Sequence, residues 1–533
     1  MKMRPRVAAA VLSLLIGPGA ADRPLAHAQE VGDRAVNPIL WSDVPDLADI
    51  RVGDSYYMSS TTMLVSPGLP IMKSNDLVNW RLVGYAYDVL DDEDALALRN
   101  GRNAYGGGSW ASSLRHHDGT FYVTTFSGTT GKTYIYRTKD PEAGPWEKTS
   151  FRPSLHDHSL FFEDDGRAYM VHGAGNIRLT ELNSDLSGIK PGGVDRIIVP
   201  NASATAGRNI GLPAEGSQLR KIDGRYYLSL ITWPRGGMRT QLTFRADSLT
   251  GPYEGRVALQ DQGVAQGGLV DTPDGEWYAL LFQDHGAVGR IPFLVPVTWE
   301  DGWPVMGVDG KVPAALNLPA STLGVRGIVG SDDFDRGPGD PPLPLAWQWN
   351  HNPEDEHWSL TQRPGFLRLT TGRVDADLLA ARNTLTQRTF GPTSSAVVTL
   401  DVAHMNDGDV AGLAALQRRY GFVGVRATGD ARSLVMVIAE ADSPTEVEVA
   451  PLAQDTVFLR LECDFRGRKD TARFAYSLDG ASWSEIGKPL RMTYTLPHFM
   501  GYRFALFQFA TRTPGGFVDF DDFRISDRID SPE

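Results

Sequence analysis

Three acidic residues stand out because each lies just before, or at the start of, an apolar run that is typical of a β-strand. They are Asp46, Asp157 and Glu215, in parts of the chain far apart in sequence. An acid near a turn usually caps backbone N–H groups, so each residue alone is weak evidence for a site. Cleavage of a glycosidic bond needs one protonated carboxyl group and one ionised carboxylate that activates water. Three acids brought to one end of a set of strands can perform that chemistry.

A repeated hairpin pattern supplies elements that can bring these acids together. A tight turn with glycine, followed by an apolar strand, occurs as VGDSYYM (52–58), HDGTFYV (117–123), DDGRAYM (164–170), IDGRYYL (222–228) and PDGEWYA (273–279). Several copies are followed by a second polar element: SNDLVNW (74–80), TKDPEAGPW (138–146), NSDLSG (183–188) and ADSLTGPY (246–253). Asp-Gly and Gly-Asp pairs are typical hairpin turns, although such hairpins occur in any all-β protein. Because the two elements recur in order, we predict a five-bladed β-propeller over residues 32–312.

The pattern changes after residue 312. Residues 313–330 are rich in Ala, Leu and Gly and are predicted to be a linker. Residues 331–530 contain short alternating strands separated by turns, which is typical of a β-sandwich. The similar segments DDFDR (332–336) and DFDDFR (519–524) are expected to pair as its first and last strands. The predicted fold class is therefore all-β, with a propeller followed by a sandwich.

Composition and the N-terminus narrow the class of protein. A chain of 533 residues is too long for one core. Its net charge of −13 argues against nucleic acid as a partner. Residues 1–28 combine basic residues, an apolar run and a small-residue cleavage site, so we predict a signal peptide and a secreted or periplasmic protein. No later run reaches the roughly 18 apolar residues that a membrane span needs.

Longer motifs around these features resemble glycoside hydrolase family 43. They are NPILWSDVPDLADIRVGDSYYM (37–58), HDHSLFFEDDGRAYMVHG (156–173), AEGSQLRKIDGRYYL (214–228) and GGLVDTPDGEWYALLFQDHGAVGRIPFLVPVTWEDGWP (267–304). Residues 347–369, WQWNHNPEDEHWSLTQRPGFLRL, resemble the concanavalin-like sandwich that accompanies exo-acting members. The resemblance implies an inverting enzyme that releases terminal α-L-arabinofuranose or β-D-xylose from hemicellulose fragments such as xylan, arabinoxylan and arabinan. The alternative is a non-catalytic carbohydrate-binding propeller.

The resemblance also implies roles for individual residues. Asp46 of the VPD motif matches the general base, Glu215 of AEGS the general acid, and Asp157 of HDHS the acid that modulates the proton donor. Arg290 of VGRIPFLVP matches a residue that hydrogen-bonds sugar hydroxyls. Trp110 lies near the position of the sugar platform, with a core tryptophan as the alternative.

Other expectations concern the pocket wall, the metal and the partner domain. Met63 is expected in the pocket wall, and residues 418–425 are the candidate sandwich loop that closes the pocket. The chemistry requires no cofactor. Gln266 stands where many members carry a histidine that helps hold a calcium ion, which argues against a His-bound structural calcium. His156 and His158 have zinc-binding spacing but lack a third ligand, so they are expected to make hydrogen bonds. The oligomeric state is left open.

Overall fold

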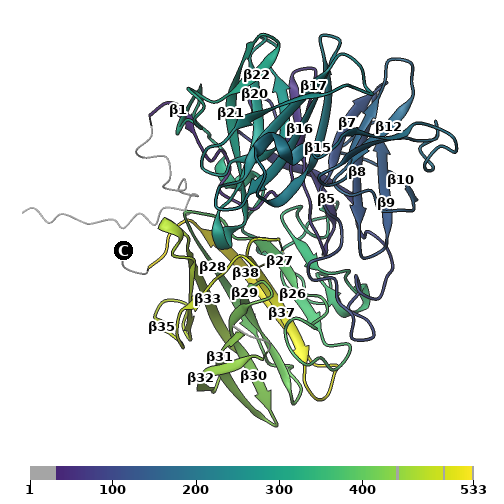
Figure 1. Cartoon of the computed structure of the whole chain (residues 1–533). Helices are drawn as coiled ribbons and strands as arrows, with labels where there is room; N and C mark the ends of the chain where they lie inside the picture. Colours follow the sequence, from purple (N-terminus) through teal and green to yellow (C-terminus); the bar gives the residue numbers. More distant parts are fainter. Residues whose placement is uncertain (1–31, 440–442, 496–498, 531–533) are drawn as a thin grey trace, which may run out of the picture.

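The computed structural model describes residues 32–439, 443–495 and 499–530, so the predicted signal peptide lies outside the described residues. Regular structure in these ranges consists of β-strands and short 3₁₀ turns. The chain forms two bodies: the purple-to-teal N-terminal part lies above the green-to-yellow C-terminal part in Figure 1. No helix among the described residues is long and apolar enough to cross a membrane.

The first body is a propeller of five four-stranded antiparallel sheets, each formed by four strands in chain order. The first blade contains β2 (Ala48–Val52), β3 (Ser55–Ser59), β5 (Gly68–Ser74) and β6 (Arg81–Tyr87), and the second β7 (Ser113–His117), β8 (Thr120–Ser127), β9 (Lys132–Thr138) and β10 (Glu147–Phe151). The third contains β11 (Ser159–Phe162), β12 (Ala168–His172), β13 (Ile177–Glu181) and β14 (Asp195–Val199), and the fourth β15 (Ile210–Ile222), β16 (Arg225–Pro234), β17 (Thr240–Ala246) and β18 (Glu254–Leu259). The fifth contains β19 (Ala265–Asp271), β20 (Trp277–Asp284), β21 (Arg290–Glu300) and β22 (Trp303–Met306). This architecture confirms the predicted five-bladed propeller.

The repeat maps onto equivalent places in the blades. Each of the five glycine turns joins the first strand of its blade to the second, as Gly53 does between β2 and β3 with φ of 60°. The second polar element lies between the third and fourth strands in the first four blades. The first strand of each blade is the innermost one. It begins at the end of the ring opposite the glycine turn, so the residues that precede it in the five blades gather at that end.

The ring closes by packing of the first blade against the last. The innermost strands β2, β7, β11, β15 and β19 contact one another in order, and β19 contacts β2. The entering strand β1 (Arg34–Val36) pairs with β23 (Ala315–Pro319), which follows the last blade. The Asn37 side chain donates to the carbonyls of Leu294 (2.8 Å) and Pro313 (2.9 Å). These bonds fasten the start of the propeller to its end.

The segment predicted as a linker is bonded to the first blade. Besides β23 it contains the 3₁₀ turn η4 (Gly324–Gly327). The Asn79 Oδ1 atom accepts hydrogen bonds from the backbone N–H groups of Thr322 and Leu323, both at 2.9 Å. Residues 313–330 therefore form a strap on the propeller surface.

The second body is a sandwich of two sheets. One has the strand order β32 (Thr445–Leu452), β31 (Ala431–Ala439), β30 (Tyr420–Thr428), β29 (Asp409–Leu416), β37 (Arg503–Ala510), β27 (Leu385–Arg388), β24 (Gln348–Asn350), β4 (Val65–Ser66). The other has the order β25 (Trp358–Ser359), β26 (Leu367–Thr370), β38 (Phe517–Ser526), β28 (Thr393–Asp401), β33 (Thr456–Asp464), β34 (Thr471–Ser477), β35 (Trp483–Glu485), with β36 (Leu490–Arg491) also on β34. The expected pairing of the first and last segments is present between Asp332 and Phe523.

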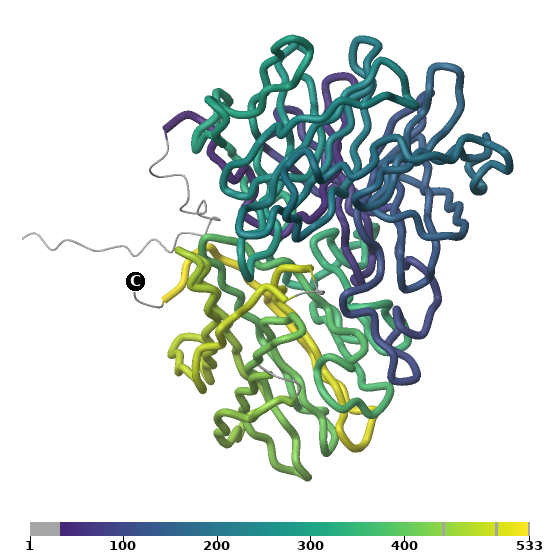
Figure 2. Tube along the Cα trace, viewed as in Figure 1, coloured from purple at the N-terminus to yellow at the C-terminus, as the bar shows by residue number. Residues whose placement is uncertain are grey.

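The sandwich and the propeller share a sheet. Strand β4 belongs to a loop of the first blade, yet it pairs with β24 at the edge of the first sandwich sheet. Further along, Ala97 and Leu98 of the propeller accept hydrogen bonds from Arg382 and Arg373 of the sandwich. In Figure 2 the purple part of the chain accordingly descends beside the green part of the sandwich. The two bodies are thus joined by backbone pairing as well as by side chains.

Candidate active site

The three predicted acids lie at the same end of the propeller ring, on three different blades. Asp46 precedes β2, Asp157 precedes β11, and Glu215 lies within β15. Asp46 and Asp157 are buried, and both have positive φ, 50° and 46°. A positive φ is uncommon for a residue with a side chain and indicates that surrounding contacts impose the turn. The backbone here is shaped to aim these carboxylates rather than to continue the strand.

Backbone hydrogen bonds hold Asp157 beside Glu215. The Gly216 N–H donates to Asp157 Oδ2 (3.0 Å), and the Ser217 N–H donates to the Asp157 carbonyl (3.2 Å). Burial raises the pKa of the Asp157 carboxyl group to about 7, and the neighbouring Glu215 carboxylate adds to the rise. Asp157 is therefore protonated for much of the time at neutral pH and can share a proton with its neighbour.

Asp46 is held by a buried arginine. The Arg290 guanidinium donates to Asp46 Oδ1 at 2.5 Å, and its Nε atom donates to Asp284 Oδ1 (3.2 Å) and to the Tyr494 hydroxyl (3.0 Å). Burial raises the pKa of Asp46, whereas the positive charge of Arg290 acts in the opposite direction. The structure thus brings the predicted Arg290 directly onto the predicted Asp46.

Glu215 has a partner that the sequence reasoning had assigned only to hydrogen bonding. The His156 Nε2 atom lies 2.9 Å from Glu215 Oε2 and 4.0 Å from Asp157 Oδ1. Burial alone lowers the pKa of His156, but the hydrogen bond to Glu215 and the nearby carboxylates outweigh it and raise the pKa to about 9. Glu215 and His156 therefore form a charge-assisted pair at the edge of the site. The second histidine, His158, bonds Leu155 and Thr124 instead, so both histidines make the expected hydrogen bonds.

Aromatic contacts continue the ring of residues around the site. The His156 ring meets Phe126 edge-on at 5.2 Å, and Phe126 stacks on Trp110 at 6.3 Å. Trp110 meets Phe499 edge-on at 5.2 Å, and the Arg290 guanidinium lies over the Phe499 ring at 5.2 Å. Each neighbour contacts the next, from Glu215 through these rings to Arg290 and Asp46. This run of contacts is the perimeter of the site, and it combines aromatic side chains with carboxylates, one histidine and one arginine.

Met63 lies behind the aromatic side chains of the perimeter and is not part of the perimeter itself. Its side chain is 1% exposed and belongs to the apolar cluster against which Trp110 and Phe499 pack. Its backbone pairs with Ser109, next to Trp110. Of the predicted binding residues, Arg290 and Trp110 thus lie on the perimeter and Met63 lies beneath it.

The sandwich loop at the site is not the expected one. Residues 420–428 form strand β30, whose Tyr420 and Phe422 side chains are buried in the sandwich, so the prediction that 418–425 closes the pocket is wrong. Alternating apolar residues of this kind are typical of a strand. The residues that reach the site, Tyr494 and Phe499, come from the stretch between β36 and β37. This stretch has no periodicity in sequence, so no local signal could identify it.

A buried carboxylate fixes this stretch to the site. Asp43 Oδ1 accepts the Arg290 N–H (2.7 Å), and Asp43 Oδ2 accepts the Gly501 N–H (3.0 Å). On the sandwich side, Gln417 donates to the Met500 carbonyl at 2.9 Å. Asp43, the first of the three acids in residues 43–49, therefore has a positioning role.

Beneath the acids, the Asp49 carboxylate is paired with an arginine instead of being offered to a calcium ion. A Cβ atom on Gly216 would lie 2.9 Å from the Gln266 side chain, so the amide packs directly under the Glu215 turn. The backbone N–H of Gln266 donates to Gln241 Oε1 (2.8 Å). The Asp49 carboxylate is bonded to Arg220 at 2.8 Å, with Arg115 also nearby. Two guanidinium groups supply the positive charge that a cation would otherwise bring.

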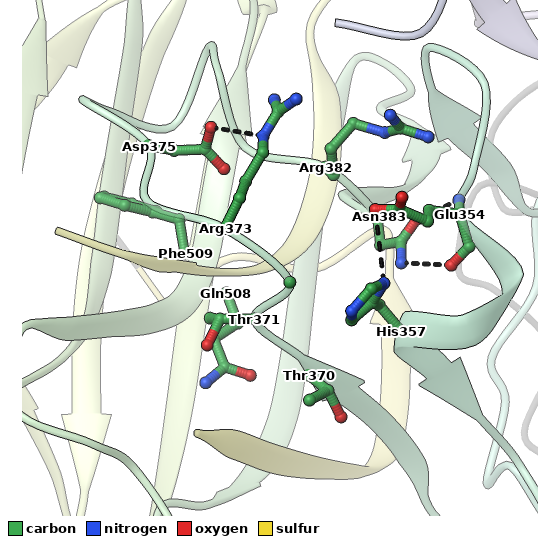
Figure 3. Close-up of a pocket in the computed structure, with 11 residues that line it drawn as sticks. Glu354, His357, Thr370, Thr371, Arg373, Asp375, Arg382, Asn383, Gln508 and Phe509 are labelled. Atoms are coloured by element: carbon green, nitrogen blue, oxygen red, sulfur yellow. Dashed lines mark hydrogen bonds and ion pairs between the residues drawn. The ribbon is translucent and has the colours of Figure 1, made fainter. Parts of the chain in front are cut away.

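A separate small pocket lies in the sandwich, away from the acids. Figure 3 shows its lining, in which Arg373 binds Asp375 and Asn383 bonds Glu354. The Arg373 and Arg382 side chains also bond the Leu98 and Ala97 carbonyls of the propeller, at 2.5 and 2.6 Å. These polar groups are committed to joining the two bodies, so this pocket is part of the interface.

Comparisons with known proteins place both bodies in one family. Residues 35–304 match the model described as glycosyl hydrolases family 43, and residues 331–526 match the β-xylosidase C-terminal concanavalin A-like domain. A β-xylosidase of Formosa agariphila is 30% identical over 92% of this chain and 89% of its own length. A non-reducing end α-L-arabinofuranosidase of Bacteroides ovatus is 32% identical over 62% of this chain and 64% of its own length.

A solved structure supports the same assignment. The bifunctional GH43-CE protein of Bacteroides eggerthii is 58% identical, with a TM-score of 0.92 over 93% of this chain. The chain spans 64% of that protein's length. Together with the propeller, the sandwich and the acids at the ring end, these matches show that the chain belongs to glycoside hydrolase family 43.

Proposed function

We propose that this site binds one terminal sugar of a hemicellulose fragment and releases it by hydrolysis. The observation that carries the proposal is that Asp46, Asp157 and Glu215 lie at one end of the ring, with Arg290 bonded to Asp46 and His156 bonded to Glu215. Release of a terminal sugar is supported by the names of the similar proteins, a β-xylosidase and a non-reducing end α-L-arabinofuranosidase. Apolar rings offer surfaces for the C–H faces of a sugar, and Arg290 offers donors for its hydroxyl groups.

In the proposed mechanism, Asp46 is the general base and Glu215 the general acid. Asp46 takes a proton from a water molecule as the water oxygen forms a bond to the anomeric carbon. Glu215 gives its proton to the oxygen of the leaving sugar as the glycosidic bond breaks. Because water attacks directly from the opposite face, the anomeric configuration inverts. Residues of this chain provide every proton transfer in this scheme, without a metal.

Asp157 and Arg290 prepare the two groups for opposite tasks. Arg290 stabilises the ionised form of Asp46 that a base requires. Asp157, with its pKa of about 7 and its contact to the backbone beside Glu215, keeps a proton near the acid. After each turnover the proton left on Asp46 must leave and Glu215 must regain one. The half-exposed His156, at 2.9 Å from Glu215, is suited to return it.

The released sugar is proposed to be β-D-xylose or α-L-arabinofuranose, since the similar proteins carry the names β-xylosidase and α-L-arabinofuranosidase. Product analysis by NMR on xylo-oligosaccharides and arabinoxylo-oligosaccharides tests this directly. We expect one monosaccharide with an inverted anomeric centre at the earliest times. A retained configuration, or products longer than one sugar, would contradict the mechanism or the exo-action respectively.

Export is part of the proposal, since a hemicellulose chain is met outside the cytoplasm. Residues 1–28 carry the features of a signal peptide. N-terminal sequencing of the protein recovered from the periplasm or the medium should show a start after residue 28. Recovery only in the cytoplasm with an intact N-terminus would contradict export.

A further inference from the structure

Two large apolar side chains are exposed on one hairpin of the fourth blade, next to the proposed acid. Trp233, at the end of β16, is 41% exposed, and Met238, in the turn before β17, is 39% exposed. Exposed large apolar groups that lie together at a site rim are typical of ligand contact. Neither residue belongs to the perimeter described above.

The hairpin begins on the strand that pairs with the strand of Glu215. Strand β16 pairs with β15, with Ile231 opposite Glu215 and Trp233 opposite Leu212. The chain thus carries Trp233 two residues beyond the position opposite the acid, toward the end of the ring where the acids gather. A strand rises about 3.3 Å per residue, so Trp233 begins roughly 7 Å beyond Ile231, about the width of one sugar ring.

The hairpin that carries Trp233 is linked to Asp46, the proposed general base, through a series of charged side chains. The Arg239 guanidinium lies over the Trp233 ring at 5.4 Å and forms an ion pair with Asp284. Asp284 in turn accepts a hydrogen bond from Arg290 at 3.2 Å, and Arg290 binds Asp46. Trp233 is therefore linked to Asp46 through Arg239, Asp284 and Arg290, and it lies on the strand that pairs with the strand of Glu215.

The indole is held rigidly and offers an apolar surface. Its N–H donates to the Gly237 carbonyl at 3.0 Å, and the turn is closed by the Gly237 N–H on the Pro234 carbonyl at 3.0 Å. Because the N–H is satisfied within the hairpin, the exposed part of the ring is carbon. Such a surface matches the C–H face of a sugar ring better than its hydroxyl edge.

We propose that Trp233 is the platform for the leaving-group sugar, the ring on the far side of the bond that is cleaved. The proposal rests on the proposed exo-hydrolysis, because that reaction places the released sugar inside the perimeter and the next sugar outside it. The ligand class is a pyranose ring of an oligosaccharide backbone. Met238 borders this platform.

The test compares substrates with and without a sugar in the leaving group. For Trp233→Ala we expect kcat/KM on xylotriose or an arabinoxylo-oligosaccharide to fall roughly 3- to 10-fold, the loss of one aromatic contact. The rate on the matching methyl glycoside, which has no leaving-group ring, should stay unchanged. Trp233→Phe should restore most of the loss. Val257→Ala, an apolar residue of the same blade that is 43% exposed, is the control and should change neither rate.

Two kinetic outcomes would contradict the proposed role of Trp233. An equal loss on both substrates would indicate a structural role, and no loss on either would exclude the contact. If the wild-type protein hydrolyses neither substrate, the proposed function has failed, and calorimetric binding of xylotriose to wild-type and Trp233→Ala proteins decides the platform separately. Equal affinities in that experiment would overturn it.

Discussion

At the residue scale, the two proposed catalytic carboxyl groups are distinguished by their partners. Asp46 receives a guanidinium, which favours its ionised form, whereas Glu215 faces His156 on one oxygen and lies near the raised-pKa carboxyl of Asp157. Hydrolysis needs this difference, since a base and an acid with the same environment would titrate together. Asp46 is thus paired with a permanently charged arginine, whereas Glu215 is paired with a titrating histidine and lies beside the carboxyl group of Asp157, whose pKa is raised to about 7.

Replacing Glu215 tests its assignment as the acid. Glu215→Gln keeps the shape but has no carboxyl proton to transfer, so kcat should fall by roughly 10²- to 10⁴-fold on natural oligosaccharides. The fall should be much smaller on p-nitrophenyl glycosides, whose leaving group needs little protonation. Steady-state kinetics on both substrate types gives the comparison. Equal losses on both would mean that Glu215 acts in some other step.

Replacing His156 tests the proton supply through pH dependence. The pKa of His156 is about 9 in the folded protein, above its ordinary value, so the Glu215–His156 pair keeps its proton up to about that pH and loses it above. His156→Gln retains a donor to Glu215 but removes the titrating ring. We expect the alkaline limb of the kcat/KM profile to move to lower pH, toward the titration of Asp157. The pKa of that carboxyl group, about 7 in the wild-type protein, should itself rise when the positive charge of His156 is removed.

The shape of the profile separates proton supply from simple support. A variant with a lower rate but an unchanged alkaline limb would show that His156 only holds Glu215 in place. The matched control is His158→Gln, because His158 is buried nearby but bonds Leu155 and Thr124. Its profile should keep the wild-type alkaline limb.

At the element scale, short sequence patterns predicted the blades but not the sandwich stretch, between β36 and β37, that reaches the site. The five hairpins could be identified because a glycine with positive φ and an adjacent strand are encoded within a few residues. Asp46, Asp157, Glu215 and Arg290 could be placed because their motifs lie next to those hairpins. Phe499 and Tyr494 could not, since they reach the site only through packing of a distant domain. Residues 418–425 were expected to be the closing loop, but Tyr420 begins a strand whose side chains pack in the sandwich core.

At the element scale, we predict that the Asp43 carboxylate holds the sandwich stretch between β36 and β37 against Arg290. The asparagine in Asp43→Asn has a single acceptor oxygen. The backbone N–H of either Gly501 or Arg290 therefore loses its acceptor, which should lower the free energy of unfolding by about 1–3 kcal/mol. We expect faster amide hydrogen exchange at residues 499–502 and a lower kcat/KM. Asp49→Asn, an equally buried change bonded to Arg220, is the control. Unchanged exchange at 499–502 in Asp43→Asn would show that other contacts hold this stretch.

At the scale of the whole molecule, the propeller does not contain every residue of the site. The sandwich contributes Phe499 and Tyr494 to the perimeter, and the first blade contributes β4 to a sandwich sheet. This exchange of elements runs in both directions, so neither body can move away without breaking backbone pairing. The geometry of the site is consequently a property of the joined molecule.

The joined architecture predicts one cooperative unfolding transition rather than two. Arg373 and Arg382 strengthen the join by bonding the Leu98 and Ala97 carbonyls from the sandwich side. Replacing both with alanine leaves those buried carbonyls without partners, at about 1–3 kcal/mol each. Differential scanning calorimetry should show a single transition for the wild-type protein and a lower or split transition for the double variant. Arg524→Ala, which removes an exposed ion pair with Asp522 within the sandwich, should leave the transition unchanged. Two resolved transitions in the wild-type protein would instead mean that the bodies fold independently, and that Phe499 reaches the site by docking of a preformed domain.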